Sequence, residues 1–145
     1  MIKEYNNWVK ELEDFLNKNS LYEPRVVKNY TSTSTYFPII SFPLNNTVDT
    51  DYCTIDKIEK YDAFYLTLDV YTKDTTINGV KIASQEINDE LTDLIIKFFN
   101  SKNMKRTLCK PTPNADKNIL RRTIQYQGLY GNARGNIIRR WNIWN

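Results

Sequence analysis

The chain has 145 residues, of which 41% are hydrophobic and 13% are aromatic. This is the size of one domain with room for a core, and the composition is too hydrophobic for an intrinsically disordered protein. No segment reaches the roughly 20 apolar residues of a transmembrane helix, and the first residues lack the basic start and apolar run of a secretory signal, so we expect a protein made in the cytoplasm without a membrane partner.

The net charge of +3 conceals two parts of opposite charge. Residues 1–100 contain 10 Lys/Arg and 16 Asp/Glu, a net charge of −6, whereas residues 101–145 contain 10 Lys/Arg and 1 Asp, a net charge of +9. The sequence leaves three interpretations open. The basic part binds nucleic acid, or it pairs with the acidic part of its own chain, or it meets the acidic part of a neighbouring copy in a ring.

The first predicted element is an amphipathic helix over residues 2–18. Its apolar residues recur at steps of three and four and form one stripe: Ile2, Tyr5, Trp8, Val9, Leu12, Phe15 and Leu16. A strand is predicted from Arg25 to Tyr30, and an irregular one from Tyr36 to Leu44, since prolines interrupt the second. The polar residues 45–60 predict a long loop or a protruding hairpin.

The clearest strand runs from Tyr61 to Lys73, because apolar residues at even positions alternate with Tyr65, Thr67, Asp69 and Tyr71. Residues 78–99 predict a second helix, with its acids facing outward and Asn78 or Thr76 as its N-cap. Strands over 104–110 and 118–127 and a C-terminal arm over 129–145 follow. This order predicts a single α+β domain, a small antiparallel or mixed sheet with two helices on one face.

The chain lacks the residues of common catalytic and metal sites. It has no histidine, and it contains no phosphate-binding or nucleophile-elbow motif. Cys53 and Cys109 do not form a CxxC pair and favour reduced, partly buried thiols. Asp49, Asp51 and Asp56 offer oxygen ligands for a hard cation but lack the glycine and the final glutamate of an EF-hand, so a solvated loop is favoured. We therefore predict no metal, no cofactor and no enzymatic activity.

The basic part suggests an interface. Arg121 and Arg122 are adjacent in a predicted strand, so they point to opposite faces and cannot share one DNA-facing surface. Arginines beside tryptophans near the C-terminus are typical of phosphate binding or of a protein interface, and we favour the interface because no nucleic-acid-binding motif accompanies them. The candidate interface residues are Asp49, Asp51, Asp56, Arg121, Arg122, Arg134, Arg139, Arg140, Trp141 and Trp144.

Three stretches carry a resemblance to a known family. They are YFPIISFPL, then YLTLDVYTKDT followed after a short turn by GVKIASQEINDELTDLI, and then MKRTLCKPTPNADKNILRRTIQYQG. Together they cover roughly residues 36 to 128, and they resemble the tail terminator or tail completion proteins of long-tailed phages, of the lambda type. Their motifs are patterns of element order and residue type. Residues 45–60 and the segment IIRRWNIWN do not match the family pattern.

The resemblance implies a small sheet packed by helices and no enzymatic activity. It implies a hexameric ring that caps the tail tube at the head-proximal end of the virion tail, after assembly in the host cytoplasm. Expected partners are other copies of the chain, the tail tube protein, the head completion or neck protein and the sheath protein, with genome DNA crossing the channel. In such a ring we expect part of the basic set to pair with acids of the neighbouring copy. The alternatives are a head–tail connector or neck protein and a small basic nucleic-acid-binding module.

Overall fold

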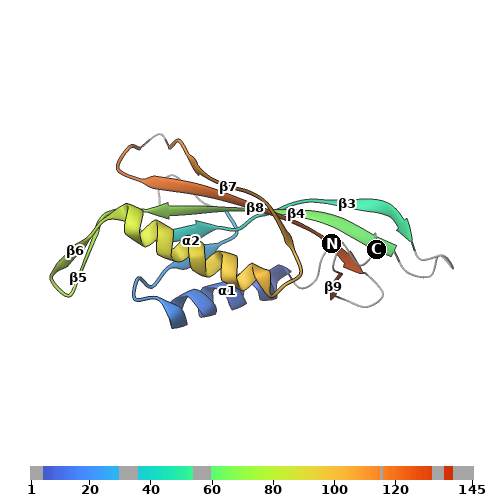
Figure 1. Ribbon diagram of the computed structural model, residues 1–145, viewed down its shortest axis with the longest axis horizontal. Helices are drawn as coiled ribbons and strands as arrows, with labels where there is room; N and C mark the ends of the chain where they lie inside the picture. The colour runs from blue at the N-terminus through green and yellow to red at the C-terminus, as the bar shows by residue number, and fades with distance from the viewer. Residues whose placement is uncertain (1–4, 30–35, 54–59, 115, 132–135, 139–145) are drawn as a thin grey trace.

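A computed structural model describes residues 5–29, 36–53, 60–114, 116–131 and 136–138, with the backbone alone for 44–53, 60–63, 129–131 and 136–138 (Figure 1). Its helices are α1 (Tyr5–Asn19) and α2 (Ser84–Asn100). Its strands are β1 (Arg25–Val27), β2 (Ile39–Ser41), β3 (Leu44–Cys53), β4 (Lys60–Thr72), β5 (Thr75–Ile77), β6 (Val80–Ile82), β7 (Lys105–Thr112), β8 (Leu120–Gly131) and β9 (Asn136–Ile138).

The main sheet is mixed and has the strand order β1-β2-β4-β8-β7. In addition, β3 pairs with β4 and β9 pairs with β8. The β1–β2 pair is parallel, and the other pairs of this sheet are antiparallel. Both helices lie on the same face of the sheet, and the small β5–β6 hairpin projects from one end (Figure 1). The predicted α+β fold with two helices on one face is therefore confirmed.

The core lies between the helices and the apolar face of β4. Phe64, Leu66, Leu68 and Val70 are fully buried, as the alternation in the sequence predicts. They pack against both helices and against Ile40 of β2 and Ile124 and Tyr126 of β8. The helical residues that complete this core are Trp8, Leu12, Leu16, Ile87, Leu91, Ile95, Phe98 and Phe99. The described residues of the stripe predicted for the first helix therefore pack in the core, and the acids of the second helix are exposed, as predicted.

The polar segment after Pro43 is a strand over much of its length. Leu44–Cys53 forms β3, which pairs with β4 in a register interrupted by two irregularities. The loop alternative for residues 45–60 is therefore wrong over 45–53, and the hairpin alternative holds there. Asn and Asp disfavour strands, but the long β4 offers hydrogen-bonding partners that outweigh this preference. Residues 54–59 lie outside the described part of the chain.

The second helix begins later than the sequence predicted. Residues 75–82 form the β5–β6 hairpin, whose turn places Asn78 at φ 52° and Gly79 at φ 79°. An Asn-Gly pair with two positive φ angles is typical of a two-residue hairpin turn, so the predicted helix start was wrong. The predicted caps are also wrong, since Asp74 Oδ1 accepts a hydrogen bond from Ser84 N–H at 2.8 Å.

One end of the sheet extends beyond the helices. In Figure 1, β3, β9 and the adjoining ends of β4 and β8 project past α1 and α2. We call this part the strand arm. Part of the predicted C-terminal arm belongs to it, because β8 continues to Gly131 and residues 136–138 pair with β8 as β9. The arm gives the molecule a backbone surface that neither helix covers.

A close approach between β4 and β8 depends on a glycine. Gly128 lies opposite Phe64 in the register, and a Cβ atom placed on Gly128 would lie 2.7 Å from Phe64 Cζ. Real Cβ atoms do not approach a ring carbon so closely, and the ring is fully buried among the core side chains. The phenylalanine therefore occupies space that any other residue at 128 would need.

We expect Gly128→Ala to lower the free energy of unfolding by about 1–3 kcal/mol, because overpacking a core forces side chains from their preferred rotamers. Urea unfolding followed by circular dichroism measures the change. In a Phe64→Leu background the same substitution should cost clearly less, since the ring that it clashes with is gone. An equal cost in both backgrounds would contradict this explanation.

Tyr126 is the buried polar side chain without a hydrogen-bond partner among the described residues. Its ring stacks on Phe99 with centroids 4.6 Å apart, and the residue is fully buried. Burial raises the pKa of the Tyr126 hydroxyl from 10.0 to about 12, because the tyrosinate would lose its hydration. The hydroxyl therefore lowers the free energy of unfolding at neutral pH, and it lowers this free energy further in strong base.

Tyr126→Phe should raise the free energy of unfolding at pH 7 by about 1 kcal/mol, because it removes an unsatisfied buried hydroxyl. Above pH 10 the unfolded chain loses the tyrosine proton before the folded chain does, so stability falls as pH rises from 10 to 12. The variant should lose less stability than the wild type over that range. Urea unfolding at both pH values measures both effects, and a variant that is less stable at pH 7 would refute the first.

Candidate functional site

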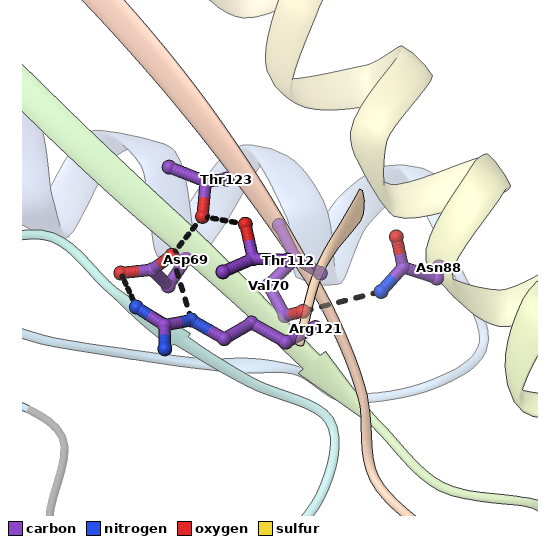
Figure 2. Close-up of polar contacts among 6 residues, drawn as sticks. All are labelled: Asp69, Val70, Asn88, Thr112, Arg121 and Thr123. Atoms are coloured by element: carbon purple, nitrogen blue, oxygen red, sulfur yellow. Dashed lines mark hydrogen bonds and ion pairs between the residues drawn. The ribbon is translucent and has the colours of Figure 1, made fainter. Parts of the chain in front are cut away.

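The sheet face opposite the helices carries a buried carboxylate. Asp69 of β4 is only 8% exposed. Arg121 of β8 binds it in a bidentate manner, with Nε 3.1 Å from Oδ1 and a terminal nitrogen 3.2 Å from Oδ2 (Figure 2). Thr123 also donates its hydroxyl to Oδ1 at 2.6 Å. The carboxylate therefore has three donors, which is the condition under which a buried charge is tolerated.

The same network reaches β7. The hydroxyl oxygens of Thr112 and Thr123 lie 2.5 Å apart. Because Thr123 donates its proton to Asp69, Thr112 must be the donor in this second bond. The bond to Asp69 raises the pKa of Arg121 above its ordinary value. The network joins β4, β8 and β7. The Asp69 carboxylate and the Arg121 guanidinium already bind each other, so this arrangement is suited to holding the three strands together, and we call it the clamp.

Polar contacts also attach α2 to the other face of the sheet. The buried Asn88 donates to the Val70 carbonyl at 3.1 Å and to Thr72 Oγ1 at 3.3 Å (Figure 2 shows the first). Arg122 forms an ion pair with Asp89 at 2.9 Å. Arg121 and Arg122 therefore lie on opposite faces of β8, which confirms the prediction from their adjacency in a strand.

All three ion pairs among the described residues join the two oppositely charged parts of the chain. They link Lys102 to Glu11 at 2.7 Å, Arg121 to Asp69 at 3.1 Å and Arg122 to Asp89 at 2.9 Å. Each cation comes from residues 101–145 and each carboxylate from residues 1–100. Of the three interpretations of the charge asymmetry, pairing within the chain therefore applies to these three cations.

Other charges remain on the surface. Lys105, Arg106 and Lys110 are exposed on β7, and we call them the β7 basic edge. Three exposed acids of α2 form a second surface, which we call the α2 acidic face: Glu86, Glu90 and Asp93. Glu90 accepts a hydrogen bond from the Tyr22 hydroxyl, which raises the pKa of that tyrosine to about 12.

The structure places the predicted interface residues unevenly. Arg121 and Arg122 have partners inside the chain, so a role between copies stays a prediction for them. Asp49 and Asp51 lie in β3, where the backbone alone is described. Six further residues lie outside the described part: Asp56, Arg134, Arg139, Arg140, Trp141 and Trp144. Cys109 is a free thiol and is exposed, which corrects its predicted partial burial.

The alternation of residues predicted that Asp69 lies on the polar side of its strand, but it predicted no role for this side chain. Its one signal is that an acid interrupts the apolar and aromatic run FYLTLDVY. Its partners follow only from the β4–β8 register, which brings Thr123 directly opposite Asp69. Asn88 was also missed, because an asparagine on a mostly apolar helix face has no motif of its own.

Within the described residues, no three His, Cys, Asp or Glu side chains are grouped as metal ligands would be. The helices of that part are also too short or too polar to cross a membrane. In comparisons with known proteins, no protein-family model and no curated protein matches the chain.

Arg121→Met should lower the free energy of unfolding by about 2–3 kcal/mol, because Asp69 would stay buried without its cation. Arg122→Met is the matched control, since its partner Asp89 has a side chain that is 52% exposed, and it should cost less than about 1 kcal/mol. Urea unfolding measures both. The double variant Arg121→Met with Asp69→Asn should lose less free energy of unfolding than the two single variants together. Equal losses for Arg121→Met and Arg122→Met would argue against the clamp.

Proposed function

We propose that this chain is a non-enzymatic structural protein of a phage virion, a tail terminator. Copies of it form a ring, most simply a hexamer, that caps the tail tube, stops tube polymerisation and joins the tail to the head. Its partners are then other copies of itself, the tail tube protein and the head completion or neck protein, with the sheath protein in a contractile tail. Genome DNA passes through the ring.

The observation that supports this proposal is where the resembling stretches lie in the fold. YFPIISFPL contains β2, and the second stretch runs from within β4 through the β5–β6 hairpin into α2. The third stretch contains β7 and most of β8. In the sheet these strands are neighbours in the order β2-β4-β8-β7, and α2 packs on β4 and β8. Segments that are separate in the sequence thus form one continuous unit of structure, as expected if the resemblance reflects a common fold.

The distribution of surfaces also suits a ring subunit. A subunit of a ring needs two different surfaces that complement each other, and it needs a third to reach the tube or the neck. The described residues offer a basic edge, an acidic helix face and a strand arm that extends beyond both helices. We assign the strand arm to the contact with the tube or the neck.

Disrupting the gene should give lysates with overlong, headless tails, because nothing would stop tube polymerisation. Tail length by negative-stain electron microscopy measures this, and expression of the wild-type gene in trans should restore normal length. Tails of normal length that are unattached to heads would instead favour a connector or neck protein.

Intact infectious particles would refute a structural role in the virion. The nucleic-acid-binding alternative would then predict DNA binding that weakens steeply as salt rises.

A further inference from the structure

The two edges of the main sheet differ in how they are closed. At the β1 edge, the backbone N–H of Val26 donates to Glu13 Oε2 of α1 at 3.0 Å, so a helix side chain occupies that edge. At the other edge, β7 pairs with β8 and with no further described strand. An open edge of eight residues is a place where another chain can bind.

The residues of β7 disfavour a strand as its occupant. Pro111 has no N–H to donate to a ladder, and three cations lie along the same strand. Lysines and prolines are the residues that natural proteins place on edges to prevent strand addition. An occupant that is acidic and offers side chains instead of a strand edge avoids both obstacles.

The β7 basic edge has no counter-charge inside the described chain. None of its three cations forms a hydrogen bond or ion pair with a described residue, and β7 contains no acid, so the strand carries a net charge of +3. The cations of the nearby sheet and loop behave differently, since Lys102, Arg121 and Arg122 all have carboxylate partners.

The α2 acidic face has the opposite surplus. Its residues Glu86, Glu90 and Asp93 are spaced by four and three positions, so they form one row along the helix. The helix contains four acids and one lysine, a net charge of −3. Among described residues Glu86 and Asp93 have no hydrogen bond or ion pair, whereas Glu90 accepts from Tyr22.

We propose that the β7 basic edge of one copy docks along the α2 acidic face of the next copy. In the register, Lys105 and Lys110 share the face of Gln127 and Thr123, whereas Arg106 lies on the face of Tyr126, so a partner meets all three cations only if it approaches β7 along the open edge. The charges of +3 and −3 are equal and opposite, and the surfaces belong to different elements of the fold. The contact is therefore heterologous, and repeating it gives a ring or a filament. The inference relies on the proposed function only for the premise that the chain assembles with itself.

The test exchanges the charges of the two surfaces. One variant carries Lys105→Glu, Arg106→Glu and Lys110→Glu, the second carries Glu86→Lys, Glu90→Lys and Asp93→Lys, and the third carries all six changes. Each single-surface variant should raise the dissociation constant for self-association by about 10–100-fold, because each contact becomes one between like charges. An equimolar mixture of the first two should assemble as the wild type does, since each contact then joins opposite charges, and so should the six-fold variant.

Sedimentation equilibrium in low salt measures association, and thermal melting by circular dichroism checks that each variant is folded. A matched control reverses three exposed lysines outside both surfaces, Lys10, Lys18 and Lys117. This control has the same net charge as the first variant and should associate as the wild type does. Disulfide trapping gives a second measurement: Asp93→Cys should form covalent oligomers through the exposed Cys109, and Cys109→Ser should abolish them.

Several outcomes would overturn the inference. They are single-surface variants that associate normally, a mixture that does not recover, and a wild-type chain that stays monomeric at every concentration. Loss of duplex DNA binding in the first variant, with unchanged association, would assign the β7 basic edge to nucleic acid instead. None of these results changes tail length in the gene disruption, so the proposed function and this inference fail separately.

Discussion

The antiparallel pairing of β4 with β8 extends over twelve residue pairs, from Tyr61–Gly131 to Thr72–Leu120. Every other described strand of the main sheet is attached to one of these two strands, directly or, for β1, through β2. Because side chains alternate between the faces, this pairing produces one apolar face that both helices cover and one polar face. The core, the placement of α2 and the position of the strand arm therefore all depend on the β4–β8 register.

Alternation alone does not determine that register. A slip of one residue would expose the core side chains, but a slip of two would keep every side chain on its own face. Two features distinguish the native register from the two-residue slip. Asp69 meets Thr123 only in this register, and the slip would leave a buried carboxylate without that donor. Gly128 makes room for the Phe64 ring, and the slip would place a tyrosine there. Both features reduce the hydrophobic area that the sheet can bury, and both favour the native register over the shifted one.

The local periodicities of the sequence predicted the fold class, the two helices and the faces of β4, because each depends on residues only a few positions apart. The elements that it missed depend on distant partners or on a competing turn. β3 exists because β4 lies beside it, and Asp69 finds Arg121 52 positions further along the chain. The helix start was misplaced because Asn78 was interpreted as an N-cap, although Asn78 and Gly79 together also favour a hairpin turn.

The charge asymmetry separates into two parts with different roles. Lys102, Arg121 and Arg122 connect the basic part to the acidic part inside one chain, and the Asp69–Arg121 pair is the most deeply buried of these. The unpaired charges of β7 and α2 contribute little to folding, since exposed charges are well hydrated and salt screens them beyond about 8 Å at physiological ionic strength. Charges of this kind attract a complementary surface once it approaches within that distance. Their position on an open edge and along one row of a helix therefore bears on which neighbour fits and in which orientation.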